Sequence, residues 1–300
     1  MTGVVIAAHN EASVIGRCLD NLLADSLPDE FEIVVVANGC DDATATIAAA
    51  RNTVRVIELA EPSKPAALNA GDAAIDAFPR IYLDADIVLT TAGARALRDA
   101  LLCPPKATRP AGCPTLAAVP RRTLDLRARP LMVRAYFAIN SRLPVFRHGL
   151  FGRGAIAVSR AGRARFERFP DMVADDLFLD SVFDQGEKSE VDQIETVVAA
   201  PLRTRDLVRR LVRVRRGNAA MRAAAREGQV TVPVRNADRF SWLRDVIVPE
   251  PRLAPAAVVY VAITVWAAFL ARRNAGAAEP WGQDNSTRPA TPIVRGDSCA

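Results

Sequence analysis

The stretch Ile81–Leu89, with the sequence IYLDADIVL, is an apolar run interrupted by two aspartates. Its apolar residues predict a buried strand that ends in an acidic step. Two carboxylates this close repel each other, and a buried charge is costly unless it is paired or bound to a metal. Hard carboxylate oxygens are the ligands that magnesium and manganese prefer. We therefore expect Asp84 and Asp86 to bind Mn2+ or Mg2+, although a lone Asp-x-Asp pair also occurs in solvated turns.

Strands and helices alternate upstream of this stretch. The apolar patterns predict strands at residues 3–8, 31–37 and 54–59, and helices at residues 14–23, 43–51 and 66–77. Such an alternation implies right-handed crossovers. The expected fold class is therefore α/β, with a mostly parallel twisted sheet that carries helices on both faces.

Polar residues follow the ends of three of these strands. Ligands of open α/β sheets gather at the carboxyl ends of strands, so we expect these residues to meet at one edge. Asn10 is also a plausible cap for the first helix. The residues are His9, Asn10, Glu11, Asn38, Asp42, Asp84 and Asp86.

The second half of the chain contains a second acidic step and an arginine-rich segment. Asp175 and Asp176 stand at the head of an apolar helix, after strands predicted at residues 115–119 and 155–159. Residues 203–226 form a helical pattern with nine arginines and one aspartate. Arg209, Arg213 and Arg216 share one face of that helix. This face is either solvated or in contact with anionic lipid, or it clamps a diphosphate.

A C-terminal hydrophobic helix is predicted at residues 253–273. Leu253–Ala271 is a run of 19 residues without a charge, which is long enough to span a membrane. Pro255 and the distal pair Arg272 and Arg273 count against a span that follows a cytosolic domain. A span, a helix lying on the membrane and a helix packed on the domain all remain open. The polar tail, residues 274–300, is predicted to be disordered.

The composition excludes several classes of protein. The net charge is +5, and nearly all of the positive charge is arginine. An arginine bias by itself is poor evidence for nucleic-acid binding, so we expect no nucleic-acid partner. Five cysteines without a CxxC pair, together with two histidines, exclude a zinc constellation. The N-terminus carries no signal-peptide pattern, so the catalytic part is expected in the cytoplasm.

Taken together, these motifs resemble the family 2 glycosyltransferases, the inverting enzymes of the GT-A fold. The resemblance runs from about residue 3 to residue 218. It rests on five stretches in the family's order, and Arg213–Gly217 stands where the family often has Gln-x-x-Arg-Trp. The stretches are Val5–Glu11, Val34–Thr44, Ser63–Gly71, Asp84–Asp86 and Asp175–Asp176.

The resemblance implies a GT-A domain at residues 1–226, with a nucleotide-binding half at about 1–102 and an acceptor half at about 103–226. A connecting segment, 227–252, precedes the hydrophobic helix. The resemblance also implies Mn2+ or Mg2+ on Asp84 and Asp86, and Asp176 as the base with Asp175 beside it. The residues implied in binding the nucleotide sugar are His9, Asn10, Glu11, Asn38, Asp42, Lys64, Asp84, Arg213 and Arg216.

Purely structural roles remain open for some of these residues. The alternative for Glu11 is a favourable charge in the first turn of a helix, and the alternative for Asp42 is a turn or cap residue. The alternative for His9 is a spacer at the strand end. Ala37 stands where the family usually has an aspartate that contacts the base, which leaves the choice of nucleotide open. The missing Gln and Trp argue against a processive synthase.

The expected function is a metal-assisted, single transfer with inversion, from a UDP- or GDP-linked sugar to an acceptor hydroxyl. The acceptor is a glycan, a lipid-linked molecule or a small molecule, and a cell-envelope role at a membrane surface is expected. One alternative is a non-catalytic, membrane-associated protein that binds nucleotide sugars. Another is a sugar-phosphate nucleotidyltransferase, but that class opens with a Gly-rich basic loop and this chain has Ala8–Glu11 there.

Overall fold

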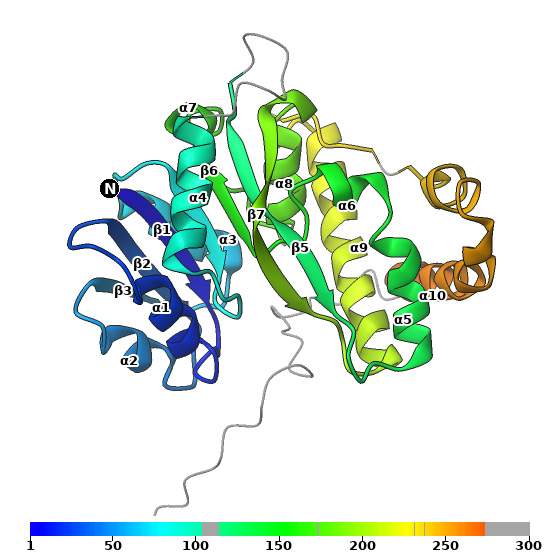
Figure 1. The fold of residues 1–300 in the computed structure, drawn as a ribbon, viewed down its shortest axis with the longest axis horizontal. Helices are drawn as coiled ribbons and strands as arrows, with labels where there is room; N and C mark the ends of the chain where they lie inside the picture. Colours follow the sequence, from blue (N-terminus) through cyan, green and yellow to red (C-terminus); the bar gives the residue numbers. More distant parts are fainter. Residues whose placement is uncertain (104–113, 173, 231, 237, 274–300) are drawn as a thin grey trace, which may run out of the picture.

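The computed structural model describes residues 1–103, 114–172, 174–230, 232–236 and 238–273. Within these residues, seven strands form one sheet in the order β3-β2-β1-β4-β6-β5-β7 (Figure 1). The strands are β1 Thr2–Ala8, β2 Phe31–Asn38, β3 Val54–Leu59, β4 Arg80–Asp84, β5 Ala117–Asp125, β6 Ala155–Val158 and β7 Lys188–Ala199. The helices are α1 Ile15–Leu23, α2 Thr44–Ala49, α3 Lys64–Ala73, α4 Thr91–Leu102, α5 Leu131–Asn140, α6 Pro144–His148, α7 Arg160–Arg163, α8 Asp175–Val182, α9 Thr204–Arg226 and α10 Ala254–Arg273.

The prediction of a mostly parallel sheet covered on both faces is confirmed. β1 pairs in parallel with β2 and β4, β2 with β3, and β5 with β7, whereas β6 runs antiparallel to β4 and β5. Alternate residues of β1 face opposite layers. Val5 packs in the layer that contains residues of α3, α8 and α9. Val4 and Ile6 pack in the layer that contains residues of α1, α2 and α4.

The parallel pairing brings the expected site residues to one edge. Ala7 is opposite Asp84 in the β1–β4 pair, and Ala8 is opposite Ala37 in the β1–β2 pair. The carboxyl ends of β1, β2 and β4 therefore lie side by side, as the topology predicted.

The sequence reading missed β7 and shortened β5. The sequence of β7, KSEVDQIETVVA, buries only Val191 and Thr196 fully, so it lacks a clean apolar alternation. β5 continues as far as Asp125 because its polar second half pairs with β7. A register shift between Pro120 and Arg121 separates the two parts of this ladder. The missed strand is thus stabilised by pairing rather than by its own pattern.

The hydrophobic helix α10 packs on the domain at the opposite end of the molecule from β3 (Figure 1). Tyr260 stacks on Tyr136 of α5 with ring centroids 5.1 Å apart, and Ile263 is buried. The connecting segment before it contains two short helical turns, Trp242–Ile247 and Pro251–Leu253. In the described part of the chain, Pro251–Arg273 is long and apolar enough to cross a membrane. The predicted disordered tail, 274–300, lies outside the described residues.

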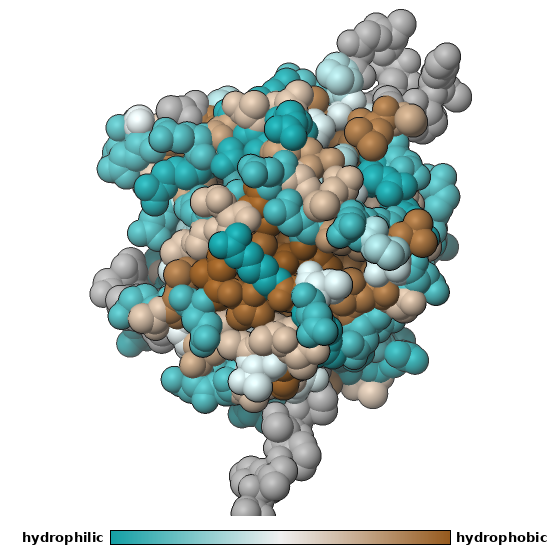
Figure 2. Space-filling view, turned by 90° about the vertical axis from the view of Figure 1, so that its left-hand side faces the viewer, coloured by the Kyte–Doolittle hydropathy of each residue, from teal (hydrophilic) through white to brown (hydrophobic). Residues whose placement is uncertain are grey.

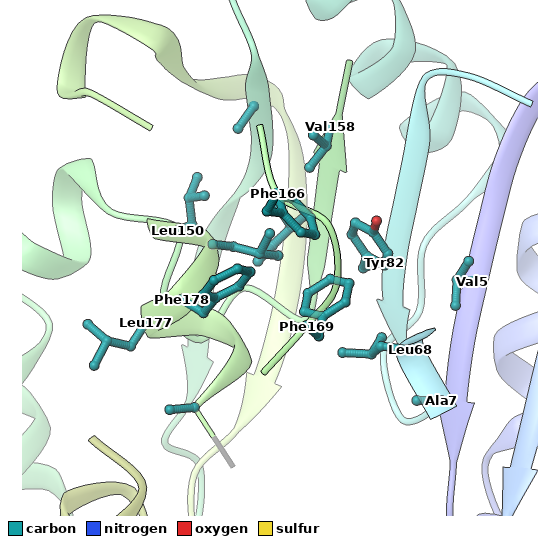
Figure 3. Close-up of a cluster of buried hydrophobic side chains, with 14 of the residues drawn as sticks. Val5, Ala7, Leu68, Tyr82, Leu150, Val158, Phe166, Phe169, Leu177 and Phe178 are labelled. Carbon is teal, nitrogen blue, oxygen red and sulfur yellow. The ribbon is translucent and has the colours of Figure 1, made fainter. Parts of the chain in front are cut away.

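An aromatic cluster fixes the position of α8. The rings of Phe166, Phe169 and Phe178 lie together beside Tyr82 of β4 (Figure 3). Phe166 contacts Phe169 and Phe178 edge to face, with centroids 5.2 Å apart in both pairs. Leu177, also in this cluster, is 2% exposed. Because Leu177 and Phe178 anchor the first turn of α8, the preceding Asp175 and Asp176 are held at a defined place.

The sheet ends at β3 in an edge that carries charges. Figure 2 views the molecule from this side and shows a hydrophobic area interrupted by hydrophilic residues. On β3, Val56, Ile57 and Leu59 are half-buried, whereas Arg55 and Glu58 are exposed. Charged side chains on an edge strand oppose pairing with another chain.

A buried network around Asp72 ties α3 to β4 and α7. The Asp72 carboxylate accepts hydrogen bonds from the Tyr82 hydroxyl at 2.9 Å and from the guanidinium groups of Arg80 and Arg163. Asp72 and Arg80 are both nearly inaccessible to solvent. Removing one partner of such a network leaves an uncompensated buried charge.

We therefore expect Asp72→Ala to lower the free energy of unfolding by about 3–5 kcal/mol in urea denaturation. The matched control is Asp20→Ala, since Asp20 is 63% exposed in its pair with Arg51 and such pairs contribute less than about 1 kcal/mol. Equal losses in the two variants would contradict the assigned role of the network.

Candidate active site

Asp84, the last residue of β4, and Asp86, in the turn that follows, form the exposed side of the site. The Asp84 side chain is 46% exposed, and Asp86 is exposed in the turn that follows. The Asp84 backbone N–H donates to the Gly154 carbonyl at 2.8 Å, and the Ile87 N–H donates to the Asp84 carbonyl at 3.1 Å. These bonds fix the turn, so both carboxylates stand at the carboxyl end of the central strand.

Lys64 forms ion pairs with Asp84 and with Asp175 at the start of α8. It is the first residue of α3, after the N-cap Ser63, whose hydroxyl accepts from the Ala66 N–H at 3.2 Å. Its Nζ lies 3.0 Å from Asp84 Oδ1 and 2.8 Å from Asp175 Oδ2. Burial alone lowers the pKa of Lys64, but the neighbouring carboxylates outweigh burial and raise that pKa well above its usual value. Lys64 is therefore a fixed positive charge between the two steps.

Asp176 lies in a different environment from Asp175. Its Oδ2 accepts a hydrogen bond from the Gly152 backbone N–H at 2.9 Å. Burial and the negative charge of Asp175 raise the pKa of Asp176 to about 7, although Lys64 and the Gly152 N–H oppose this rise. A carboxylate with a pKa near neutrality is well suited to accept a proton from a hydroxyl.

His9 and Asn38 brace the ends of β1 and β2. The His9 Nδ1 atom lies 2.8 Å from the Asn38 carbonyl. The fully buried Asn38 side chain donates to the Ala8 carbonyl at 2.7 Å and accepts from the Ser63 N–H at 3.0 Å. Asn38 thus links β1, β2 and the start of α3. Nucleotide contacts by His9 and Asn38 remain predictions.

Asn10 does not cap α1, contrary to the expectation from the sequence. It adopts a left-handed conformation, with φ 53°, and its Oδ1 accepts from the Asp41 N–H at 2.8 Å. The helix begins at Ile15, and the Val14 and Ile15 N–H groups donate to the Glu11 carbonyl. The physical reason is that Asn tolerates positive φ and binds backbone across a turn, so it joins two loops instead.

Glu11 and Asp42 lie on the same pair of loops. Glu11 is 7% exposed, and its backbone N–H donates to the Thr44 hydroxyl at 2.8 Å. Asp42 accepts from the Ala12 N–H at 2.9 Å and from the Thr44 N–H at 3.0 Å. These bonds support the turn role of Asp42 that the sequence left open.

Arg213 and Arg216 lie half-buried in the middle of α9. Their contact with a donor diphosphate remains a prediction.

Comparison with known proteins finds a family model that matches the N-terminal third of the chain. Residues 3–98 match the family model described as Glycosyl transferase family 2. This part of the chain is therefore similar to a family 2 glycosyltransferase domain. No curated protein matches the sequence.

Comparison with solved structures shows that the chain has the GT-A fold. One is a mannosyltransferase from Pyrobaculum calidifontis in complex with GDP-Man and Mn2+; the identity is 21%, the TM-score is 0.54, and the match covers 91% of this chain and 79% of that one. Another is glucosyl-3-phosphoglycerate synthase from Mycobacterium tuberculosis in complex with Mn2+, UDP-Glc and phosphoglyceric acid. There the identity is 20%, the TM-score is 0.52, and the match covers 78% of this chain and 80% of that one.

The carboxylates of the site fit a hard divalent cation. Among the described residues there is no group of three or more His, Cys, Asp or Glu side chains placed to hold a metal. Asp84 and Asp86 are instead two carboxylates on an open edge. Magnesium and manganese at nucleotide sites are typically held by one or two carboxylates, with substrate phosphates and water completing the shell. The residues present therefore fit a cation that arrives with a diphosphate.

Two residues of the site escaped the sequence reading. Gly152, with φ 57°, supplies the N–H that binds Asp176. Arg122 of β5 lies against it, since a Cβ placed on Gly152 would be 3.1 Å from Arg122 Nη1. The three glycines of residues 149–154 are a sequence signal that could have marked Gly152. Arg122 gave none, because it lies in the polar half of β5.

The electrostatics of the site predict opposite shifts in two variants. Asp175→Asn removes a negative neighbour and should lower the pKa of Asp176, whereas Lys64→Met removes a positive neighbour and should raise it. The measurement is a 13C NMR titration of the carboxyl groups, with Asp176 assigned through Asp176→Asn. The control Asp171→Asn changes an exposed aspartate before α8 and should leave the midpoint near 7. An Asp176 that titrates near its ordinary value would show that its environment is not the one described.

Proposed function

We propose that the protein transfers a single sugar, with inversion, from a nucleoside-diphosphate sugar to an acceptor hydroxyl. The observation that carries this proposal is the joining of Asp84, Lys64 and Asp175 beside Asp176. The exposed carboxylates and Lys64 form a donor side suited to a diphosphate. Asp176 is a base of suitable pKa next to it. The arrangement has no need of a covalent intermediate, because Asp176 can take the proton of the acceptor hydroxyl while the diphosphate leaves.

Asp84 and Asp86 would hold Mn2+ or Mg2+, the ions bound by the neighbouring structures. The cation would act as a Lewis acid on the leaving diphosphate. Lys64 adds a fixed positive charge on the same side. His9, Asn10, Glu11, Asn38 and Asp42 shape the loops against which the nucleotide would lie, and Arg213 and Arg216 are candidates to bind its diphosphate.

Asp176 removes the proton from the acceptor hydroxyl as that oxygen attacks. Burial and Asp175 keep Asp176 basic enough for this task, whereas the Gly152 N–H orients its carboxylate. Asp175 is a positioning residue, since it is bound to Lys64. Ala37 is buried in β2 and offers no polar side-chain group to the uracil or guanine of the donor.

A membrane surface is the proposed location of the enzyme, with the catalytic domain in the cytoplasm and the acceptor in the cell envelope. Ala257, Ile263 and Ala267 bury one face of α10 against the domain. The opposite face exposes Val258, Val265, Trp266 and Phe269. Exposed arginines flank the helix on both sides, at Arg252 and at Arg272–Arg273. We therefore propose that α10 lies in the membrane interface rather than across the membrane.

The metal role predicts a selective loss in calorimetric titrations of UDP and GDP into the full chain. With Mn2+ present, Asp86→Ala should weaken nucleotide binding by about 100-fold, because a carboxylate ligand is lost. The control Asp99→Ala alters an exposed aspartate on α4 and should change nothing. Nucleotide binding that is independent of metal in the unmodified chain would contradict the role of Asp84 and Asp86.

Asp176→Asn separates catalysis from binding in the same samples. It should keep nucleotide affinity within about 2-fold and lower the turnover by about 10²–10⁴-fold, the usual contribution of a general base. An unmodified chain that binds donor tightly, yet neither transfers nor hydrolyses it, would favour the non-catalytic alternative.

The membrane role predicts loss of vesicle binding on Trp266→Glu/Phe269→Glu. Burial of these side chains contributes about 1.5–3 kcal/mol each, so binding to phosphatidylglycerol vesicles should weaken at least about 10-fold. Leu27→Glu is the matched control, since Leu27 is 67% exposed in the nucleotide-binding half. Co-sedimentation that does not depend on these residues would refute the interfacial helix, and retention after carbonate extraction would favour a span.

A further inference from the structure

Two arginines near the base form no ion pair with a carboxylate in the described part of the chain. Arg122 lies on β5 and Arg210 on α9, and both are half-buried. Neither forms a hydrogen bond or an ion pair with a described residue. Neighbouring arginines differ: Arg121 pairs with Glu195, and Arg153 binds Glu190 and the Pro120 carbonyl.

The Arg122 guanidinium lies between the Phe146 ring and Gly152, next to Asp176. Its Cζ lies 4.5 Å from the centroid of the Phe146 ring. Its Nη1 lies against Gly152, whose N–H binds Asp176 at 2.9 Å. Gly152 therefore lies between the Arg122 guanidinium of β5 and the Asp176 carboxylate.

The charges around Arg122 are predominantly positive. Burial and then the charges of Arg153 and Arg210 lower its pKa to about 10, and Asp176 and Glu190 offset this only in part. Glu190 already binds Arg153, and neither Arg122 nor Arg210 forms an ion pair with a described carboxylate. Half-buried guanidinium groups without a paired carboxylate are unfavourable unless they bind an anion.

We infer that Arg122 and Arg210 form an anion subsite for the acceptor, which is an alcohol carrying a phosphate or carboxylate a few bonds from its reacting hydroxyl. This inference rests on the proposed transferase function, since it places the hydroxyl at Asp176. The fork of a guanidinium fits such an anion bidentately.

The anion belongs to the acceptor rather than to the donor. The donor diphosphate is expected at Asp84, Asp86 and Lys64, after β4. Arg122 reaches Asp176 from β5, across Gly152. An anion bound there orients the acceptor so that its hydroxyl faces Asp176, which is how remote binding groups accelerate a transfer. Arg122 and Arg210 are thus specificity-determining residues.

The test is a calorimetric titration of glycerol 3-phosphate into the full chain, both alone and with UDP or GDP and Mn2+. Glycerol is the neutral control for the ligand. Dihexanoylphosphatidylglycerol, as a monomer in solution, competes for the site if the anion comes from a lipid headgroup. Inorganic phosphate reports on the anion alone.

We expect Arg122→Gln to weaken the binding of glycerol 3-phosphate by about 10- to 100-fold, since a bidentate charged contact is lost. Arg122→Lys should give a smaller loss. Nucleotide affinity should stay within about 2-fold, and the control Arg121→Gln on the same strand should leave both ligands unaffected. Glycerol should not bind measurably.

Two outcomes would overturn the inference. One is a protein that binds nucleotide but none of the anionic probes. The other is an equal loss of nucleotide and glycerol 3-phosphate affinity in Arg122→Gln, which would assign Arg122 to the donor diphosphate. Failure of the proposed function looks different: no nucleotide would bind, whereas glycerol 3-phosphate would still bind in a manner that depends on Arg122.

Discussion

The site depends on one cation, Lys64, held between Asp84 and Asp175. Without it, the carboxylates of Asp84, Asp175 and Asp176 would face one another in a partly buried space and repel. Two pairings within 3.0 Å fix the start of α3 against the end of β4 and the start of α8. The same charge limits how far the pKa of Asp176 rises. Fold and reactivity are thus linked through a single ammonium group.

Much of this arrangement could be predicted from the sequence. The apolar periods of residues 3–8, 31–37 and 54–59 gave three strands within one or two residues, and the helices between them implied crossovers and parallel pairing. Asp84, Lys64 and Asp176 were each marked by a local pattern. Their contact was not, because it depends on how α8 meets the central sheet, which the aromatic cluster around Phe169 decides.

The rest required the structure, for physical reasons that differ from residue to residue. β7 carries seven charged or polar residues and pairs along a shifted ladder, so its strand signal is weak. Asn10 and Asn38 are predicted to lie against the nucleotide, and the structure adds that their side chains bind backbone groups across the loops. A short polar residue after a strand is compatible with both roles. The backbone contacts could not be predicted because they depend on the positions of neighbouring loops.

The electrostatic coupling between Asp84 and Asp176 links binding at the donor side to the protonation of the base. The negative charge of Asp84 is one of the causes that raise the pKa of Asp176. Any ligand that neutralises Asp84 therefore lowers this pKa and favours the ionised base at neutral pH. A divalent cation bound at Asp84 would thus favour the ionised, proton-accepting form of Asp176. An acceptor anion held by Arg122, close to Gly152, would raise the pKa of Asp176 again.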